Sequence, residues 1–208
     1  MPPKTIEDKV IARIYGKSRG YVFTPKDFLH LGNHESVRQA LARLTAKGTI
    51  RRLMRGIYDY PAFSAFLNAP ASPDPDGIAQ AIARANGWTI HPTGATALNL
   101  LGLSTQVPAQ WTYLTDGPTK NYKWQGGTLK FRHRTSKEAA NLSRETELVV
   151  QSLKALGKER VNDSVIRQIK LRLTPKERDR ALKEARYAAS WVYEVIKRIA
   201  TEDGLQNA

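Results

Sequence analysis

The apolar residues between positions 34 and 47 repeat at the period of an α-helix. Spacings of 3, 1 and 3 place them on one stripe, formed by Val37, Ala40, Leu41 and Leu44. Asn33 precedes the stripe as a possible N-cap, and Gly48 follows it as a stop signal. The pattern therefore predicts an amphipathic helix over residues 34–47.

Shorter patterns on both sides of this helix extend the prediction. Thr24 as N-cap and Pro25 at the first helical position predict a short helix before it, and Thr5 caps an earlier helix. Residues 21–23 favour a small strand, and residues 50–60 favour a tight hairpin. The order helix, strand, helix, helix, hairpin predicts a winged helix-turn-helix.

The outer side of the 34–47 helix favours contact with DNA. At about 100° per residue, this side carries Glu35, Ser36, Arg38, Gln39, Ala42, Arg43 and Ala46. Arginine, glutamine and serine can hydrogen-bond base edges, and small alanines allow the backbone to lie deep in a major groove. Residues 37–56 hold six basic side chains and no acidic one, which suits phosphate binding. The alternative is an ordinary helix and hairpin whose basic face is merely solvated.

The expected contacts with double-stranded DNA follow from this placement. The 34–47 helix would enter the major groove, and the hairpin tip at Arg55 would reach the backbone or the minor groove. The full expected set is Thr24, Lys26, His34, Ser36, Arg38, Gln39, Arg43, Lys47, Arg51, Arg52 and Arg55. The polar residues of the helix would contact base edges or position the helix on the DNA. The three hairpin arginines would bind phosphate or contact the minor groove.

A proline-rich stretch marks the expected domain boundary, since residues 61–77 contain four prolines. The expected division is a DNA-binding domain at 1–61, a connection at 62–77 and a regulatory domain at 78–208. Phe63, Phe66 and Leu67 argue against a free linker, and we expect them to dock on one of the two domains.

The remainder of the chain first mixes helices and strands and then becomes helical. Asp76 is the expected cap of a helix over 78–85, and a hairpin is expected around Gly126-Gly127. From Ser143 onward the pattern is helical. The predicted fold class is α+β: an N-terminal winged helix-turn-helix, a small mixed α/β unit and a C-terminal helical segment.

The last predicted helix begins with Thr174 as N-cap, Pro175 at the first helical position and Glu177 at the third, and it runs to about residue 200. Its apolar positions recur at spacings of 3 and 4, at Leu182, Ala185, Ala189, Val192, Ile196 and Ile199. This seam either packs onto its own domain or binds a partner helix. The basic first half of the helix is either solvated or a second nucleic-acid patch.

The charge of the chain points to an acidic polymer or a membrane surface as its partner. The formal net charge is +14, and residues 1–60 carry 12 Lys and Arg against 5 Asp and Glu. No run of 18 apolar residues and no signal-peptide pattern is present. With no cysteine in the sequence, disulfides and thiolate metal sites are excluded. These features lead us to expect a cytoplasmic protein.

The sequence offers little catalytic chemistry. His30 and His34 are four residues apart, but Gly32 and Asn33 interrupt a helix between them, and no carboxylate cluster accompanies them. No phosphate-binding or dinucleotide-binding glycine pattern occurs, and the serines have no nucleophile-elbow context. We therefore expect no enzyme, no cofactor and no metal site.

Several segments together resemble a known family. YVFTPKDFLHLG, VRQALARLTAKGTIRRLMRGIYDYP, TGATALNLLGLSTQVP and YLTDGP are similar to segments of the AbiEi-like proteins, over about residues 5–135. These proteins are bacterial antitoxins and transcriptional regulators of abortive-infection systems. The resemblance implies an N-terminal winged helix that binds inverted repeats in its own promoter. It also implies a C-terminal antitoxin region and a nucleotidyltransferase-like toxin that is neutralised without a stable complex.

The leading hypothesis is a transcriptional repressor that binds specific double-stranded DNA and serves as the autoregulating antitoxin of such a system. It would be a monomer or weak homodimer, with two copies possible on DNA and no membrane partner. The alternative is an interaction protein that uses the C-terminal seam, in which the winged helix is structural or binds DNA non-specifically.

Overall fold

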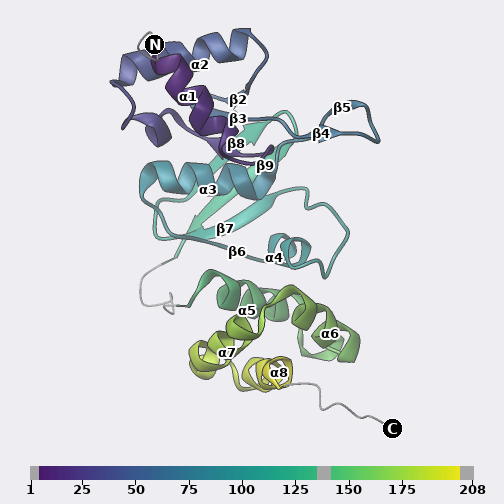
Figure 1. Cartoon of the computed structure of the whole chain (residues 1–208). Helices are drawn as coiled ribbons and strands as arrows, with labels where there is room; N and C mark the ends of the chain where they lie inside the picture. The colour runs from purple at the N-terminus through teal and green to yellow at the C-terminus, as the bar shows by residue number, and fades with distance from the viewer. Residues whose placement is uncertain (1–4, 135–141, 202–208) are drawn as a thin grey trace. The chain divides into compact units, whose positions relative to one another are not determined.

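The computed structural model describes residues 5–134 and 142–201, a chain of mixed helices and strands (Figure 1). In chain order, the elements are α1 (Ile6–Tyr15), β1 (Val22–Phe23), η1 (Pro25–Phe28), α2 (His34–Ala46), β2 (Arg51–Met54), β3 (Ile57–Asp59), β4 (Phe63–Ser64), β5 (Ala69–Pro70), α3 (Pro75–Asn86), β6 (Ile90–Pro92), α4 (Ala95–Leu100), β7 (Trp111–Thr115), β8 (Lys120–Trp124), β9 (Gly127–His133), α5 (Arg144–Leu156), η2 (Lys158–Arg160), α6 (Asp163–Arg172), α7 (Pro175–Glu184), η3 (Ala185–Tyr187) and α8 (Ser190–Ala200). The strand orders are β1-β3-β2, β4-β5 and β6-β7-β9-β8. The α+β class expected from the sequence is confirmed.

The N-terminal helices and the first sheet form one core. Its buried residues are Val10, Ile14, Phe23, Phe28, Val37, Ala40, Leu41, Leu44, Ile50 and Tyr58. The apolar stripe predicted for the second helix faces this core, where α2 packs against α1. In the sheet, β3 pairs antiparallel with β1 and with β2. Packing of the stripe therefore fixes which side of α2 is left for solvent.

Local cap signals of this region are confirmed. The Thr5 hydroxyl accepts from the backbone N–H of Asp8 at 3.1 Å, and the Asp8 carboxylate accepts from the backbone N–H of Thr5 at 2.9 Å. The Asn33 side chain accepts from the backbone N–H of Ser36 at 2.8 Å and so caps α2. Caps of this kind satisfy N–H groups that have no partner inside the helix.

The chain divides into two compact units. Unit 1 comprises Met1–Ile90 and Asn121–Leu129, and unit 2 comprises His91–Lys120 and Lys130–Ala208. This division lies further along the chain than the expected connection at 62–77, because α3 packs against β1 and β3. Arg84 of α3 donates to the Asp27 carboxylate at 2.9 Å, and this hydrogen bond raises the pKa of Arg84. The helix after the proline-rich stretch thus belongs to the same unit as α1 and α2.

Helix α3 begins earlier than the sequence suggested. Asp74, not Asp76, is its N-cap, and Pro75 takes the first helical position. The Asp74 carboxylate accepts from the backbone N–H groups of Asp76 and Gly77 at 3.1 and 3.0 Å. Proline at the first turn makes this earlier start favourable, since its missing N–H would have no partner there.

The first part of the stretch expected to be a connection, residues 62–77, forms a hairpin. Strands β4 and β5 pair Phe63 with Pro70 and Ser64 with Ala69. The expectation that Phe63, Phe66 and Leu67 dock on a domain is wrong, since these side chains are 58%, 95% and 65% exposed. The turn between the strands places Asn68 at φ 47, in the left-handed region that asparagine tolerates.

The core of unit 2 is built from α5–α8. Val149, Leu153, Ile169, Val192 and Ile196 are fully buried in it. The capping box at the start of α7 is confirmed, since Thr174 and Glu177 exchange backbone and side-chain hydrogen bonds. Within residues 5–134 and 142–201, no helix is long and apolar enough to cross a membrane.

The prediction of a single long C-terminal helix is wrong. It is broken into α7 and α8 by the turn η3 and by Ala188, whose backbone is extended. The predicted seam is therefore not continuous, and its residues Val192, Ile196 and Ile199 lie in the core of their own unit. Of the two alternatives for the seam, packing onto its own domain is the one observed, so these side chains are not available to a partner.

Candidate nucleic-acid interface

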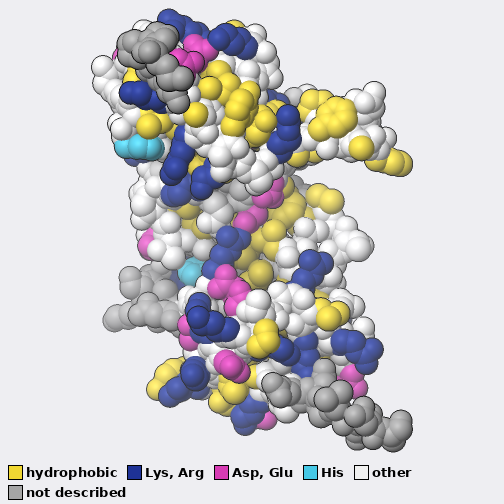
Figure 2. Space-filling model, in the orientation of Figure 1, with side chains coloured by type: hydrophobic (Ala, Val, Ile, Leu, Met, Phe, Trp, Pro, Cys, Tyr) yellow, Lys and Arg dark blue, Asp and Glu magenta, His cyan; other side chains and the backbone are white. Residues whose placement is uncertain are grey.

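The solvent face of α2 carries the polar residues that the sequence assigned to it. Arg38 and Gln39 are exposed, and so are Ala42, Arg43 and Ala46. The buried stripe on the opposite side holds the helix in the core, so this face is presented by a rigid element. In the view of Figure 2, Lys and Arg side chains lie over the region of α1 and α2, with acidic side chains beside some of them.

Glu35 organises the first turn of that face. Its carboxylate forms an ion pair with Arg38 at 3.6 Å and accepts a hydrogen bond from the Gln39 amide at 3.2 Å. The Arg38 side chain remains 63% exposed. Ser36 uses its hydroxyl proton within the cap, donating to Asn33 at 2.7 Å. Arg38 and Gln39 are therefore held side by side on the surface.

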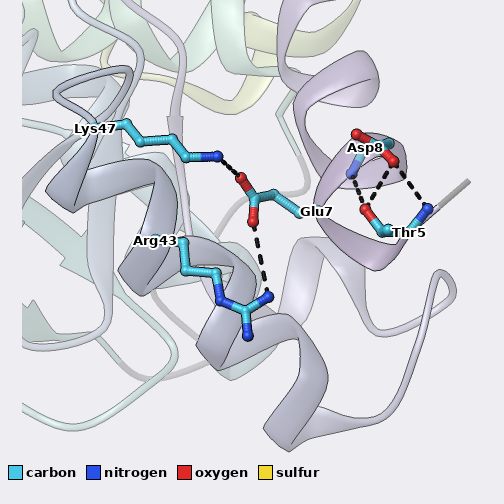
Figure 3. A network of polar contacts seen from close by, with 5 residues as sticks. All are labelled: Thr5, Glu7, Asp8, Arg43 and Lys47. Atoms are coloured by element: carbon cyan, nitrogen blue, oxygen red, sulfur yellow. Dashed lines mark hydrogen bonds and ion pairs between the residues drawn. The ribbon is translucent and has the colours of Figure 1, made fainter.

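Glu7 of α1 connects the two cations at the other end of the helix. Figure 3 shows its carboxylate between Arg43 and Lys47, both from the C-terminal part of the α2 segment. The Arg43 guanidinium lies 3.9 Å from the carboxylate, and Lys47 forms a shorter ion pair with it. Glu7 is only 16% exposed, whereas Arg43 and Lys47 are 66% and 62% exposed. The cations face solvent while their counter-charge lies beneath them.

The three arginines of the β2–β3 hairpin have different surroundings. Arg51 donates to Asp59 at 3.1 and 2.6 Å and to the Ala71 carbonyl at 3.0 Å. Asp59 is buried, so this bidentate pair is part of the hairpin's internal structure. Arg52 and Arg55 are exposed. Gly56, at φ 74, allows the tight turn that presents Arg55 at the tip.

Thr24, Lys26 and His34 do not share one environment. Thr24 is 3% exposed and caps η1 together with Asp27, so its side chain lies inside the unit. Lys26 donates to the carbonyl of Ala85 at the end of α3, at 2.7 Å. His34 is exposed at the first position of α2. The exposed residues of the expected contact set are therefore Lys26, His34, Arg38, Gln39, Arg43, Lys47, Arg52 and Arg55, whereas Arg51 and Ser36 are half-buried and Thr24 is buried.

The sequence alone did not assign partners to these cations, which pair with the carboxylates of Glu7 and Glu35. Glu7 contacts residues about forty positions away, so no local pattern could indicate its role. Glu35 could be seen on the same helix face, and its spacing of three and four residues from Arg38 and Gln39 is the available signal. A phosphate bound at this face would compete with these carboxylates for the cations.

Unit 2 contains a separate buried polar network. Arg134 and Glu147 form an ion pair at 2.8 Å, with side chains 11% and 2% exposed. The Gln151 amide donates to Glu147 at 2.9 Å and accepts from the Thr93 hydroxyl at 3.1 Å. The described residues include no group of three or more His, Cys, Asp or Glu side chains placed to bind a metal. The network joins separate segments of unit 2.

His91 should make the stability of unit 2 depend on pH. Burial lowers the pKa of His91, and its buried Nδ1 has no hydrogen-bond partner among the described residues. Below an ordinary histidine pKa of about 6.5, the unfolded chain takes up a proton that the folded chain resists. Stability should therefore fall as the pH drops from 7 toward 5. Urea unfolding across this range would measure the slope, and His91→Gln should flatten it. An unchanged slope in that variant would assign the pH dependence to other groups.

Comparison with known proteins gives a family without an assigned activity. A family described as "Family of unknown function (DUF6088)" matches residues 9–182. No curated protein matches the chain. Among solved structures, the crystal structure of the RV2827C protein from Mycobacterium tuberculosis aligns with a TM-score of 0.43 and 12% identity, over 94% of this chain and 76% of that one.

Proposed function

The chain belongs to the family of unknown function DUF6088, and we propose that this member is a transcriptional repressor that binds specific double-stranded DNA. The proposed DNA-binding element is a winged helix-turn-helix formed by α1, η1, α2 and the sheet β1-β3-β2. In this arrangement α2 is the recognition helix and the β2–β3 hairpin is the wing.

The observation that carries the proposal is the composition of the exposed face of α2. Arg38, Gln39 and Arg43 point away from the core on a helix that its other face holds in place. Ala42 and Ala46 are exposed on the same face, and their small side chains let a helix backbone approach base edges. A face that combines guanidinium, amide and methyl groups matches the donors and apolar contacts used in major-groove readout.

The proposed contacts follow from which cations are exposed. Arg38, Gln39 and Arg43 would read or position bases, while Lys47, Arg52 and Arg55 would bind phosphates or the minor groove. Arg51 has a different part in the proposal, because its guanidinium is held by Asp59 and Ala71. It would fix the wing in the orientation that presents Arg52 and Arg55.

We extend the proposal to an autoregulating antitoxin on the basis of the sequence resemblance alone. The DNA would be the protein's own promoter, and the neighbouring gene would encode the toxin. Unit 2 would carry the antitoxin activity. Co-expression with the neighbouring gene would test this part separately, because rescue of growth by the full-length protein needs no operator binding.

The experiment that tests DNA binding is a fluorescence-anisotropy titration of the DNA upstream of the gene, with scrambled DNA beside it, at two salt concentrations. Preference for the upstream DNA by more than about a hundredfold would support an operator-specific repressor. Equal and steeply salt-dependent binding to both would reduce the proposal to non-specific attraction between a basic protein and DNA.

Arg55→Ala should weaken binding to upstream and scrambled DNA by a similar factor. Arg55 lies exposed at the wing tip, where it would contact phosphate without reading bases. Losing one phosphate contact should reduce the slope of log affinity against log salt by about 0.9. Titrations at four salt concentrations would measure it, with Arg167→Ala, an exposed arginine of α6, as the charge-matched control. A loss confined to the upstream DNA would contradict the assigned backbone role.

Glu7→Gln should strengthen DNA binding. The substitution removes the carboxylate that competes with phosphate for Arg43 and Lys47. Exposed ion pairs contribute up to about 1 kcal/mol, so the affinity should rise by about two- to fivefold. Glu159→Gln gives the same change in net charge at an exposed position of unit 2 and serves as the control. Equal gains in the two variants would show that only net charge matters.

A further inference from the structure

Unit 2 contains a cavity of about 540 Å³ that is lined mainly by α5, α7 and the turn η3. In this unit α5 packs against α7, and the two helices can be followed in Figure 1. Sites for small molecules commonly have volumes of about 300–1,000 Å³. Part of the cavity wall is apolar and includes the buried Val150 and Ala185. All of the lining residues belong to unit 2, so a ligand in the cavity contacts one compact unit.

The charged side chains of the cavity favour an anion. Four cationic and two anionic side chains line it, which gives a formal net charge of +2. They are Arg134, Lys154, Lys183, Arg186, Glu147 and Glu184. A phosphate monoester carries a charge of about −1.5 to −2 at neutral pH. One such group therefore matches the charge of the cavity.

Both carboxylates of the cavity already have partners within unit 2. Glu147 accepts from Arg134 at 2.8 Å and from the Gln151 amide at 2.9 Å. Glu184 accepts from the backbone N–H and the hydroxyl of Ser143, at 2.9 and 2.7 Å. These bonds hold the two carboxylates away from the remaining cations of the lining, which leaves those cations to a ligand.

The remaining three cations come from three different elements. Lys154 of α5 and Lys183 of α7 are exposed, and neither ammonium group has a hydrogen bond or ion pair with another residue of 5–134 or 142–201. Arg186 of η3 donates from its Nε to the carbonyl of Lys183 at 2.9 Å. This bond fixes the guanidinium and leaves its terminal N–H groups for another acceptor. A phosphate monoester offers three acceptor oxygens to such donors, whereas a carboxylate offers two.

An aromatic ring lies beside these cations. Tyr187 directly follows Arg186 in η3, lines the same cavity and is 90% exposed. An exposed aromatic face favours stacking of a nucleobase, because every base has an apolar face of its own. Cations that suit a phosphate and a ring that suits a base are thus presented by one cavity.

We propose that this cavity binds a nucleoside phosphate, with the phosphate on Lys154, Lys183 and Arg186 and the base against Tyr187. The site goes beyond the proposed repressor function and does not depend on it. It lies in unit 2, whereas the proposed DNA contacts on α2 and the β2–β3 hairpin lie in unit 1.

Isothermal titration calorimetry of the full chain tests the site without any DNA, so a failure of operator binding does not affect the result. The probes are adenosine monophosphate, adenosine and inorganic phosphate, each at the same salt concentration. Adenosine monophosphate should bind about tenfold or more tightly than either of the others, because it alone offers both a phosphate and a base. No binding of adenosine monophosphate, or binding no tighter than that of inorganic phosphate, would overturn the proposal.

The phosphate contacts are tested by Lys154→Gln with Lys183→Gln. This variant should weaken binding of adenosine monophosphate by about tenfold or more, because two cations next to the phosphate are lost. The control is Lys158→Gln with Lys176→Gln, which changes the net charge equally at exposed positions of unit 2 outside the lining. The control should bind like the parent. Equal losses in the two variants would mean that only the net charge of a basic protein attracts the probe.

The base contact is tested by Tyr187→Ala. This variant should weaken adenosine monophosphate by about fivefold or more and leave inorganic phosphate, measured by competition, unchanged. Phe66→Ala removes an aromatic ring that is 95% exposed in unit 1 and serves as the control. All of the replaced side chains are exposed, so each variant should keep the thermal unfolding midpoint of the parent. A Tyr187→Ala protein that binds adenosine monophosphate as tightly as the parent would refute the assigned nucleoside site.

Discussion

Glu147→Ala should lower the stability of unit 2 by about 3–5 kcal/mol, because it leaves Arg134 as an unpaired buried cation. Both partners are largely withdrawn from solvent, with side chains 2% and 11% exposed. Glu147 also accepts from Gln151, so the substitution removes a second hydrogen bond. Thermal unfolding followed by circular dichroism should show a midpoint about 6–20 °C lower for a chain of this size.

Two further variants show whether burial is the cause. Glu194→Gln breaks the exposed ion pair with Lys197 and should change the midpoint little. Replacing both members of the buried pair, as Arg134→Met with Glu147→Leu, should recover much of the loss, because no charge is then left without a partner. A Glu147→Ala protein that melts like the parent would mean that solvent reaches Arg134 and replaces its partner.

Local patterns in the sequence predicted the elements of the N-terminal region well. The stripe Val37, Ala40, Leu41 and Leu44 and the caps at Thr5 and Asn33 depend on residues within one turn or two of each other. Each of these signals lies within a short segment of the chain, so it can be read from the sequence without knowledge of the tertiary contacts. The small strand predicted at residues 21–23 is also confirmed as β1, which pairs with β3 of the hairpin.

The break between α7 and α8 shows where local patterns fail. Residues 184–191, EARYAASW, contain neither proline nor glycine, and alanine is the strongest helix former. The apolar spacing therefore predicted one continuous helix. Packing of Val192, Ile196 and Ile199 into the unit 2 core outweighs this local helix propensity. The helix is interrupted at Ala188, whose backbone is extended, and α8 begins after it.

The candidate interface was predictable only in part for the same reason. Exposure of Arg38, Gln39 and Arg43 follows from helical periodicity. The partners of these cations do not follow from periodicity. Glu7 pairs with Arg43 and Lys47 because α1 packs on α2. Arg51 donates to the carbonyl of Ala71, which lies twenty residues further along the chain. Thr24 was misplaced at the surface because a cap residue can be buried when the helix it starts is part of the core.

Arg38→Ala and Arg43→Ala should each cost roughly 1–3 kcal/mol of binding free energy on the upstream DNA, the amount expected for an arginine that contacts guanine through two hydrogen bonds. On scrambled DNA each should cost less, because only the charge is lost there. Anisotropy titrations at one salt concentration would measure both, with Arg160→Ala, an exposed arginine of unit 2, as the charge-matched control.

Combining Glu7→Gln with Arg43→Ala gives a sharper test of the proposed DNA contact of Arg43. If α2 binds DNA as proposed, Glu7 competes with DNA for Arg43 and Lys47, so Glu7→Gln should raise affinity. In an Arg43→Ala background only Lys47 remains to be freed, and the gain from Glu7→Gln should shrink. A double-mutant cycle measures this coupling directly. Unchanged operator affinity in both single arginine variants would remove α2 from the DNA contact, whatever the coupling between Glu7 and Arg43.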